Sequence, residues 1–192
     1  MGPRRTIIAA MVSSDATGAT TTLPPDLVAF IQGGASITVS SRDDRLIPSI
    51  ASGVGCRVNE NGDEITLFVF AAAAEALAHD VARQGSLAVV FSDVGTNQTV
   101  QIKGRNVTLV PTGPTDAALV RRYMALHFSA LRPFGWTENA VQTALGCDPP
   151  ELLALRFSPQ AAFQQSPGPG AGRALALTRL AVPAPSPSDP AR

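Results

Sequence analysis

The sequence predicts a mainly β (α+β) fold, a small β-barrel flanked by short helices. Three observations predict it: segments that alternate apolar with small or polar residues, glycines inside those segments, and short helical patterns between them. About six strand segments with so few helices fit a barrel better than a doubly wound sheet. We expect one domain over 23–165, a flexible leader over 1–22, and a disordered Pro-, Ala- and Gly-rich tail over 166–192.

The first elements are a helix and two strands. Pro24-Pro25 opens a short amphipathic helix, and Gly33-Gly34 ends it. Ala35–Ser40 then alternates with period two, as a half-buried strand does. Leu46–Val58 is also extended, but Gly53 inside it predicts a bulge or a bend at a barrel corner.

A hairpin and a helical connection come next. Asn61-Gly62 supplies the backbone freedom of a tight turn, so Ile65–Phe70 is expected to be the return strand. Ala72–Gln84 has apolar residues at helical spacing, and Leu87–Phe91 reads as another strand. The order strand, helix, strand predicts one parallel crossover at this point.

The last third of the domain combines one long strand with helices. Thr99–Val110 alternates on either side of Gly104, which marks a bend. Helices are expected over Thr115–Leu131 and Thr137–Leu145, and a closing strand over Leu152–Phe157.

Charge and hydropathy exclude several classes of partner. Fifteen basic and fifteen acidic residues give a formal net charge of zero, so we expect no nucleic-acid partner. No segment approaches the length of a membrane span, and the apolar run in Met1–Val12 is too short for a secretory signal. We therefore expect a cytoplasmic protein without membrane contact.

The sequence contains no recognisable catalytic apparatus or metal site among its side chains. His79 and His127 each fall in an expected helix, without a nucleophile or a ligand set at a known spacing. Cys56 and Cys147 are far apart and are expected to be reduced, buried and inert. The pair Asp43-Asp44 lies in a turn, where Asp is favoured for backbone reasons.

Uncharged hydrogen-bonding side chains are the remaining candidates for a binding site. Ser49 and Ser52 lie on one expected strand, while Gln98, Thr99 and Gln101 lie on or beside another. They could hold a planar ligand. The alternative is that they form the outward faces of half-exposed strands.

The order of these elements resembles the pyridoxamine 5'-phosphate oxidase-like, FMN-binding split-barrel family. The likeness covers about Leu23–Leu131, with Pro48 opening the second strand, the helical connection, and Thr99–Gly104 leading the later strand. Ala162–Gly172 is similar to a C-terminal signature of a poorly characterised branch of that family. The resemblance implies a split barrel that forms a homodimer, with FMN at the subunit interface and the flavin supplying the chemistry.

The resemblance also implies which residues lie near the cofactor: Ser49, Ala51, Ser52, Val69, Gln98 and Gln101. The sequence departs from the family where its oxidases hold the FMN phosphate with basic residues. Alanine or serine occupies the position on the second strand, and Ala71–Ala74 follows the third. Pyridoxamine phosphate is therefore not the expected substrate, and we expect weaker FMN binding unless Arg42, Arg57 or Arg105 replaces the missing cations.

Three functions follow from the sequence. The first is an FMN-dependent oxidoreductase of unknown substrate, with no catalytic side chain of its own. The second is a non-enzymatic binding module of the same fold that has lost the flavin. The third is a haem-binding relative in which His127 or His79 is the axial ligand.

Overall fold

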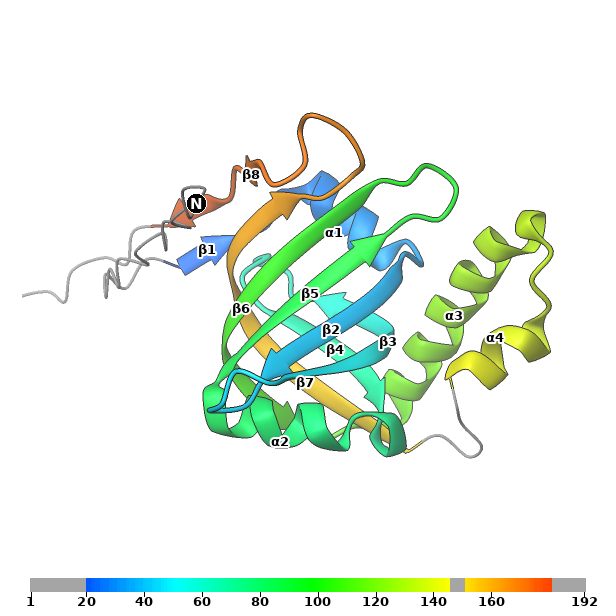
Figure 1. Cartoon of the computed structure of the whole chain (residues 1–192), viewed down its shortest axis with the longest axis horizontal. Helices are drawn as coiled ribbons and strands as arrows, with labels where there is room; N and C mark the ends of the chain where they lie inside the picture. Colours follow the sequence, from blue (N-terminus) through cyan, green and yellow to red (C-terminus); the bar gives the residue numbers. More distant parts are fainter. Residues whose placement is uncertain (1–19, 146–150, 181–192) are drawn as a thin grey trace, which may run out of the picture.

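The computed structural model describes residues 20–145 and 151–180, and its centre is a closed antiparallel barrel (Figure 1). The barrel strands are β2 (Ser36–Arg42), β3 (Pro48–Val58), β4 (Ile65–Phe70), β5 (Ser86–Ser92), β6 (Thr99–Val110) and β7 (Leu152–Gln164). They follow one another in the order β4-β3-β2-β5-β6-β7, and β7 pairs back onto β4 to close the ring. The mainly β, split-barrel fold expected from the sequence is confirmed.

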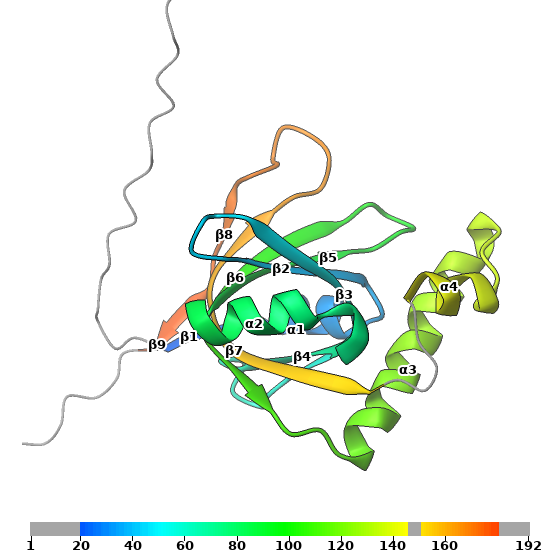
Figure 2. The ribbon, with the colours of Figure 1, turned by 60° about the horizontal axis from the view of Figure 1, so that its bottom comes forward.

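Short helices cover the ends and one side of this barrel. They are α1 (Pro25–Gln32), η1 (Ala71–Ala73), α2 (Glu75–Gln84), α3 (Pro114–Leu131), η2 (Arg132–Phe134) and α4 (Glu138–Leu145). Figures 1 and 2 show α2 lying across one end of the barrel, α1 near the other end, and α3 with α4 beside it. The apolar faces expected for the two end helices are found, since Leu27 and Ile31 of α1 and Leu77 and Val81 of α2 are buried.

Alternation along the strands separates an apolar interior from the outer surface of the barrel. In β5 every second residue is buried, and the intervening ones are partly exposed. The same period-two rule fills the interior with the largest fully buried side chains, among them Ile65, Leu67, Phe91, Ile102, Leu155 and Phe157. A smaller cluster lies outside the barrel wall, where α3 packs: Val54, Phe68, Val120 and Ala154.

Two glycines allow the barrel strands to approach other side chains. The β3–β4 register shifts between Gly53 and Gly55, and a Cβ atom added at Gly53 would lie 2.4 Å from Cγ2 of Ile37. At Gly104, where the β6–β7 register shifts, an added Cβ would lie 2.2 Å from Cδ2 of Phe157. The bends expected at these glycines are confirmed, and the missing side chains leave room for core groups.

Two expectations about the strands are wrong. The connection from β4 through α2 to β5 is not a parallel crossover, because β4 and β5 are not neighbours and every described pairing is antiparallel. Strand β7 continues past Phe157 to Gln164, although Pro159 within it has no backbone N–H group to donate to a neighbouring strand. The proline is tolerated because it pairs with Gly104, beside a register shift where the ladder is already irregular.

Ordered chain also extends beyond both expected domain limits. β1 (Thr20–Thr22) lies in the segment expected to be a leader, and β8 (Ala174–Leu175) and β9 (Thr178–Leu180) lie in the expected tail. β1 pairs with β9, and β8 pairs with β7, so main-chain hydrogen bonds offset the scarcity of apolar side chains there. The rest of the expected leader and tail, residues 1–19 and 181–192, lies outside the described residues, as does Cys147.

A buried pair of side chains joins α3 to the start of the barrel. The Tyr123 hydroxyl lies 2.9 Å from the carbonyl oxygen of Ile31 and 2.8 Å from that of Ala35. The Cys56 thiol donates to the same Ile31 carbonyl oxygen at 3.1 Å. Burial raises the pKa of both groups above their ordinary values. Cys56 is thus a buried, unreactive thiol, as the sequence predicts.

This pair predicts a loss of stability at alkaline pH. In the unfolded chain the thiol and the phenol ionise from about pH 8.5 and 10, whereas the folded chain keeps both neutral. Because their folded-state pKa values are raised, the stability that these two groups contribute is fully present below this pH range and falls as the pH rises through it. Tyr123 is the sole tyrosine, so tyrosinate absorbance should appear only as the protein unfolds.

The control for this prediction is Cys56→Ala/Tyr123→Phe. Its free energy of unfolding should be lower at neutral pH and should depend less on alkaline pH. A tyrosinate signal that titrates with an ordinary pKa in the still-folded protein would contradict the prediction.

Candidate functional site

The outward side chains of the barrel strands form rows, because the strands pair in register. One row crosses five strands without a charge: Ser52 (β3), Thr38 (β2), Val90 (β5), Gln101 (β6) and Phe163 (β7). Val90, Gln101 and Phe163 are half-buried. The row therefore offers apolar area and a few hydrogen-bonding groups on the outside of the barrel wall.

The next rows along the same strands introduce positive charge. One row consists of Ile50, Ser40, Ala88, Lys103 and Ala161. Beyond it, Arg42 lies opposite Pro48, and Arg105 lies opposite Ser86. We call these rows together the outer face; it is uncharged at one end and cationic at the other.

The three cations of the outer face contact neutral groups. Lys103 Nζ lies 5.2 Å from the ring centroid of Phe163. Arg105 Nε donates to the side-chain oxygen of Gln160 at 2.7 Å, and Arg42 Nη1 donates to the carbonyl oxygen of Asp43 at 3.4 Å. Within the described ranges 20–145 and 151–180, none of the three forms an ion pair. This end of the face can therefore attract an anionic group.

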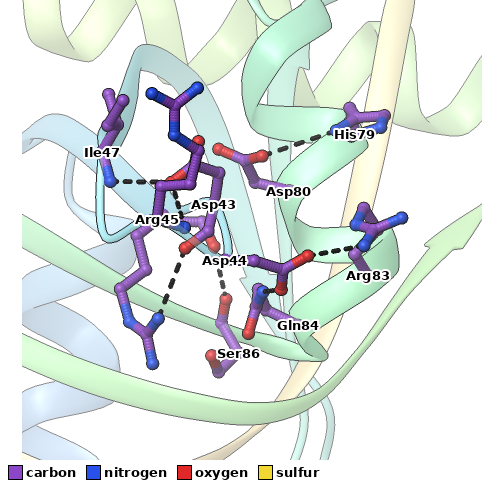
Figure 3. A network of polar contacts seen from close by, with 11 residues as sticks. Asp43, Asp44, Arg45, Ile47, His79, Asp80, Arg83, Gln84 and Ser86 are labelled. Atoms are coloured by element: carbon purple, nitrogen blue, oxygen red, sulfur yellow. Dashed lines mark hydrogen bonds and ion pairs between the residues drawn. The ribbon is translucent and has the colours of Figure 1, made fainter.

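A polar network holds the turn between β2 and β3 beside this cationic end (Figure 3). Asp43 Oδ1 accepts from the backbone N–H groups of Arg45 and Ile47, both at 2.8 Å. Asp44 binds the side chains of Arg83 and Gln84 on α2, and the hydrogen bond from Arg83 lowers its pKa. The structural role expected for the two aspartates is thus confirmed.

The structure does not bring the six predicted cofactor residues together. Ser52 and Gln101 share the outer face, and Gln98 is exposed in the turn between β5 and β6. The other three point into the barrel: Ser49, Ala51 and Val69 are 8%, 5% and 1% exposed. The Ser49 hydroxyl has no hydrogen-bond partner among the described residues. Their part in binding a cofactor stays a prediction.

The three arginines considered as replacements for the missing phosphate-binding cations also lie on different parts of the barrel. Ala71–Ala73 forms η1 and brings no charge. Arg42 and Arg105 lie on the outer face, but Arg57 lies elsewhere, where it pairs with Asp116. Lys103, which no sequence motif marks as a binding residue, completes the cationic end. The residues present on the outer face thus fit an anionic group such as the phosphate of FMN.

The two histidines occupy different environments. The His79 side chain is 70% exposed and lies 3.5 Å from Asp80, whereas His127 is half-buried and its Nδ1 lies 3.0 Å from the Gly34 carbonyl oxygen. Over the described residues, no group of three or more His, Cys, Asp or Glu side chains could hold a metal ion. In the same part of the chain, no helix combines the length and apolar character needed to cross a membrane.

Comparison with known proteins gives a likeness of fold. No protein-family model matches the chain, and no curated protein matches it in sequence. Among solved structures, HupZ of Group A Streptococcus has 11% identity and a TM-score of 0.48, with 78% of this chain and all of that chain covered. An F420 reductase has 12% identity and a TM-score of 0.47, with 73% and 98% covered.

A third match is a pyridoxamine 5'-phosphate oxidase-related, FMN binding protein from Nostoc punctiforme. It has 13% identity and a TM-score of 0.42, with 82% of this chain and 89% of that chain covered. Proteins of this oxidase-like group recur among the matched structures. At these identities the likeness concerns the fold alone.

Sequence reasoning missed most of the outer face. Thr38, Val90 and Lys103 occupy alternate positions of strands that were recognised, so period-two alternation was a signal that could have found them. Which of these residues form one row depends on the pairing register, and no motif in the sequence specifies that register.

Proposed function

We propose that the outer face binds FMN or a similar flavin and that the protein is a flavin-dependent oxidoreductase of unknown substrate. The observation that carries the proposal is the change in charge along the outer face, from uncharged side chains at one end to cationic side chains at the other. Its uncharged row offers apolar area and hydrogen-bonding groups to a ring system, and Lys103, Arg42 and Arg105 at the other end suit a phosphate. The bound flavin would supply hydride chemistry, while these residues bind and orient it.

We further propose that a second copy of the chain completes this site. Large apolar side chains are exposed at or beside the outer face, with Ile50 at 65%, Leu46 at 67% and Ile47 at 53%. Such a concentration of exposed aliphatic groups is typical of an interface. A homodimer would bury them and would exclude water from a ligand held between the copies.

A titration with FMN tests the proposal. We expect the purified chain to quench flavin fluorescence and to bind FMN with a saturating curve. Lys103→Ala should weaken binding about tenfold, because a charge-assisted contact contributes about 1.5 to 3 kcal/mol. Arg121→Ala, which removes an exposed cation from α3, serves as the matched control and should leave the affinity unchanged.

A protein that is colourless as purified and fails to bind added FMN would contradict the flavin proposal. Equal losses of affinity in the Lys103 and Arg121 variants would indicate that the flavin does not bind at the outer face. A folded dimer without flavin affinity would favour the non-enzymatic module.

His127 supports haem binding as a second candidate. A proton on Nδ1, donated to the Gly34 carbonyl oxygen, leaves the Nε2 lone pair free, which is the arrangement of an iron-ligating histidine. His79 is mostly exposed, and the contact of its Nδ1 with Asp80 Oδ1 is longer, at 3.5 Å. A Soret band in haem-reconstituted protein that His127→Ala abolishes and His79→Ala keeps would support haem, and the absence of the band would exclude it.

A further inference from the structure

A second polar site lies on another part of the barrel surface. A cavity of about 350 Å³ opens over β3, β4 and β7, on the side opposite β5 in the ring of strands. Seven residues line it: Arg57, Asn59, Glu64, Thr66, Val110, Pro111 and Arg156. The cavity shares no residue with the outer face, and the flavin proposal makes no use of it.

The strand register places two arginines on either side of one threonine. Arg57 on β3 pairs directly with Thr66 on β4, and Thr66 pairs directly with Arg156 on β7. Directly opposed residues have Cβ atoms about 5 Å apart. Two guanidinium groups can therefore reach the space above the Thr66 side chain from opposite sides.

Arg57 is held in place but remains accessible. Its Nη1 atom binds Asp116, a carboxylate that is 5% exposed and that also accepts from the Gly113 N–H at 3.0 Å. The guanidinium carbon lies 5.5 Å from the ring centroid of Phe68. The Arg57 side chain nevertheless stays 43% exposed. A ligand would bind a guanidinium group that is already oriented, so ordering this side chain would cost little conformational entropy.

Arg156 has only a weak partner. Its Nε lies 3.6 Å from Glu64 Oε2, and the two side chains are 46% and 43% exposed. An exposed pair of this kind contributes little to stability. In the described part of the chain, no hydrogen bond occupies the terminal nitrogens of Arg156. An incoming anion can therefore take the place of Glu64 at small cost.

We propose that this cavity binds the phosphate group of a small molecule between Arg57 and Arg156. A phosphate has enough oxygens to accept from both guanidinium groups and from the Thr66 hydroxyl at once, whereas one carboxylate fills a single guanidinium fork. Glu64 acts as the competing anion that a phosphate displaces.

A titration of the whole chain with inorganic phosphate tests this site. The backbone amide shifts of Thr66 and Arg156 are followed by NMR, with ionic strength held constant by sodium chloride. We expect saturating shifts in these amides. Acetate, which presents one carboxylate, should bind more weakly.

Three variants locate the phosphate. Arg156→Gln should weaken binding about tenfold, because it removes the charge-assisted hydrogen bonds of one arginine. Glu64→Gln should tighten binding, because it removes the competing carboxylate while keeping a side chain of the same size. Arg105→Gln, a matched loss of one arginine from the outer face, should leave these shifts unchanged.

Several results would overturn the proposal. One is a set of non-saturating shifts that chloride reproduces. Another is an Arg156→Gln protein that keeps a native amide spectrum and binds phosphate as the wild type does. A third is loss of phosphate binding in Arg105→Gln alone, which would place the anion on the outer face and leave the flavin proposal standing.

Discussion

Replacing Gly104 by alanine is expected to lower the free energy of unfolding by about 3 kcal/mol. The added Cβ would lie 2.2 Å from Cδ2 of Phe157, a distance that real contacts do not reach. The ring is 1% exposed and fully enclosed, so it can give way only by disturbing its neighbours. Urea denaturation of the variant measures the loss.

Gly170→Ala is the matched control, because nothing lies within 4 Å of a Cβ atom built there. Its stability should change by less than about 0.5 kcal/mol. Phe157→Leu, combined with Gly104→Ala, should recover part of the loss, since a smaller side chain makes room for the methyl group. A Gly104→Ala protein as stable as the wild type would refute the close approach of β6 to the Phe157 ring.

Replacing Asp116 by alanine is expected to cost about 2 to 3 kcal/mol. The carboxylate is 5% exposed, binds Arg57, and accepts from the Gly113 N–H at the start of α3. Its removal loses a buried charge pair and a helix cap together. The cost falls short of that of a fully buried pair, because the Arg57 side chain is 43% exposed and water can solvate it.

Asp116→Asn separates the two contributions. Its amide oxygen can still accept from the Gly113 N–H, but it carries no charge for Arg57. We expect Asp116→Asn to lose less stability than Asp116→Ala in thermal or urea unfolding. Equal losses would assign the whole effect to the ion pair, and no loss in either variant would show that the buried carboxylate does not stabilise the fold.

The strands were predictable because each carries its own evidence. The sequence predicts β4 and β6 with the bounds that the structure has, since alternation and flanking turn residues are local signals. The end of β7 was missed because Pro159 argues against a strand unless its partner is irregular. β1 and β9 were missed because each needs the other, 156 residues away along the chain.

The site was less predictable, partly because successive side chains of a strand alternate between its two faces. Ser49 and Ser52 are three positions apart in β3, and an odd separation within a regular strand turns two side chains to opposite faces. Grouping them as one surface therefore conflicts with the strand that was itself predicted. The arginine pair of the cavity was not accessible, because its alignment over Thr66 exists only after β7 joins β4.

The late position of β7 has a consequence for synthesis of the chain. β4 ends at Phe70, but the strand that covers its free edge begins at Leu152. While the ribosome is still translating the intervening segment, the outer edges of both β4 and β6 lack their partner. An uncovered edge is where nascent chains associate with one another. Ring closure is thus postponed until the last long strand has left the exit tunnel, and any holdase that assists this protein would act in that interval.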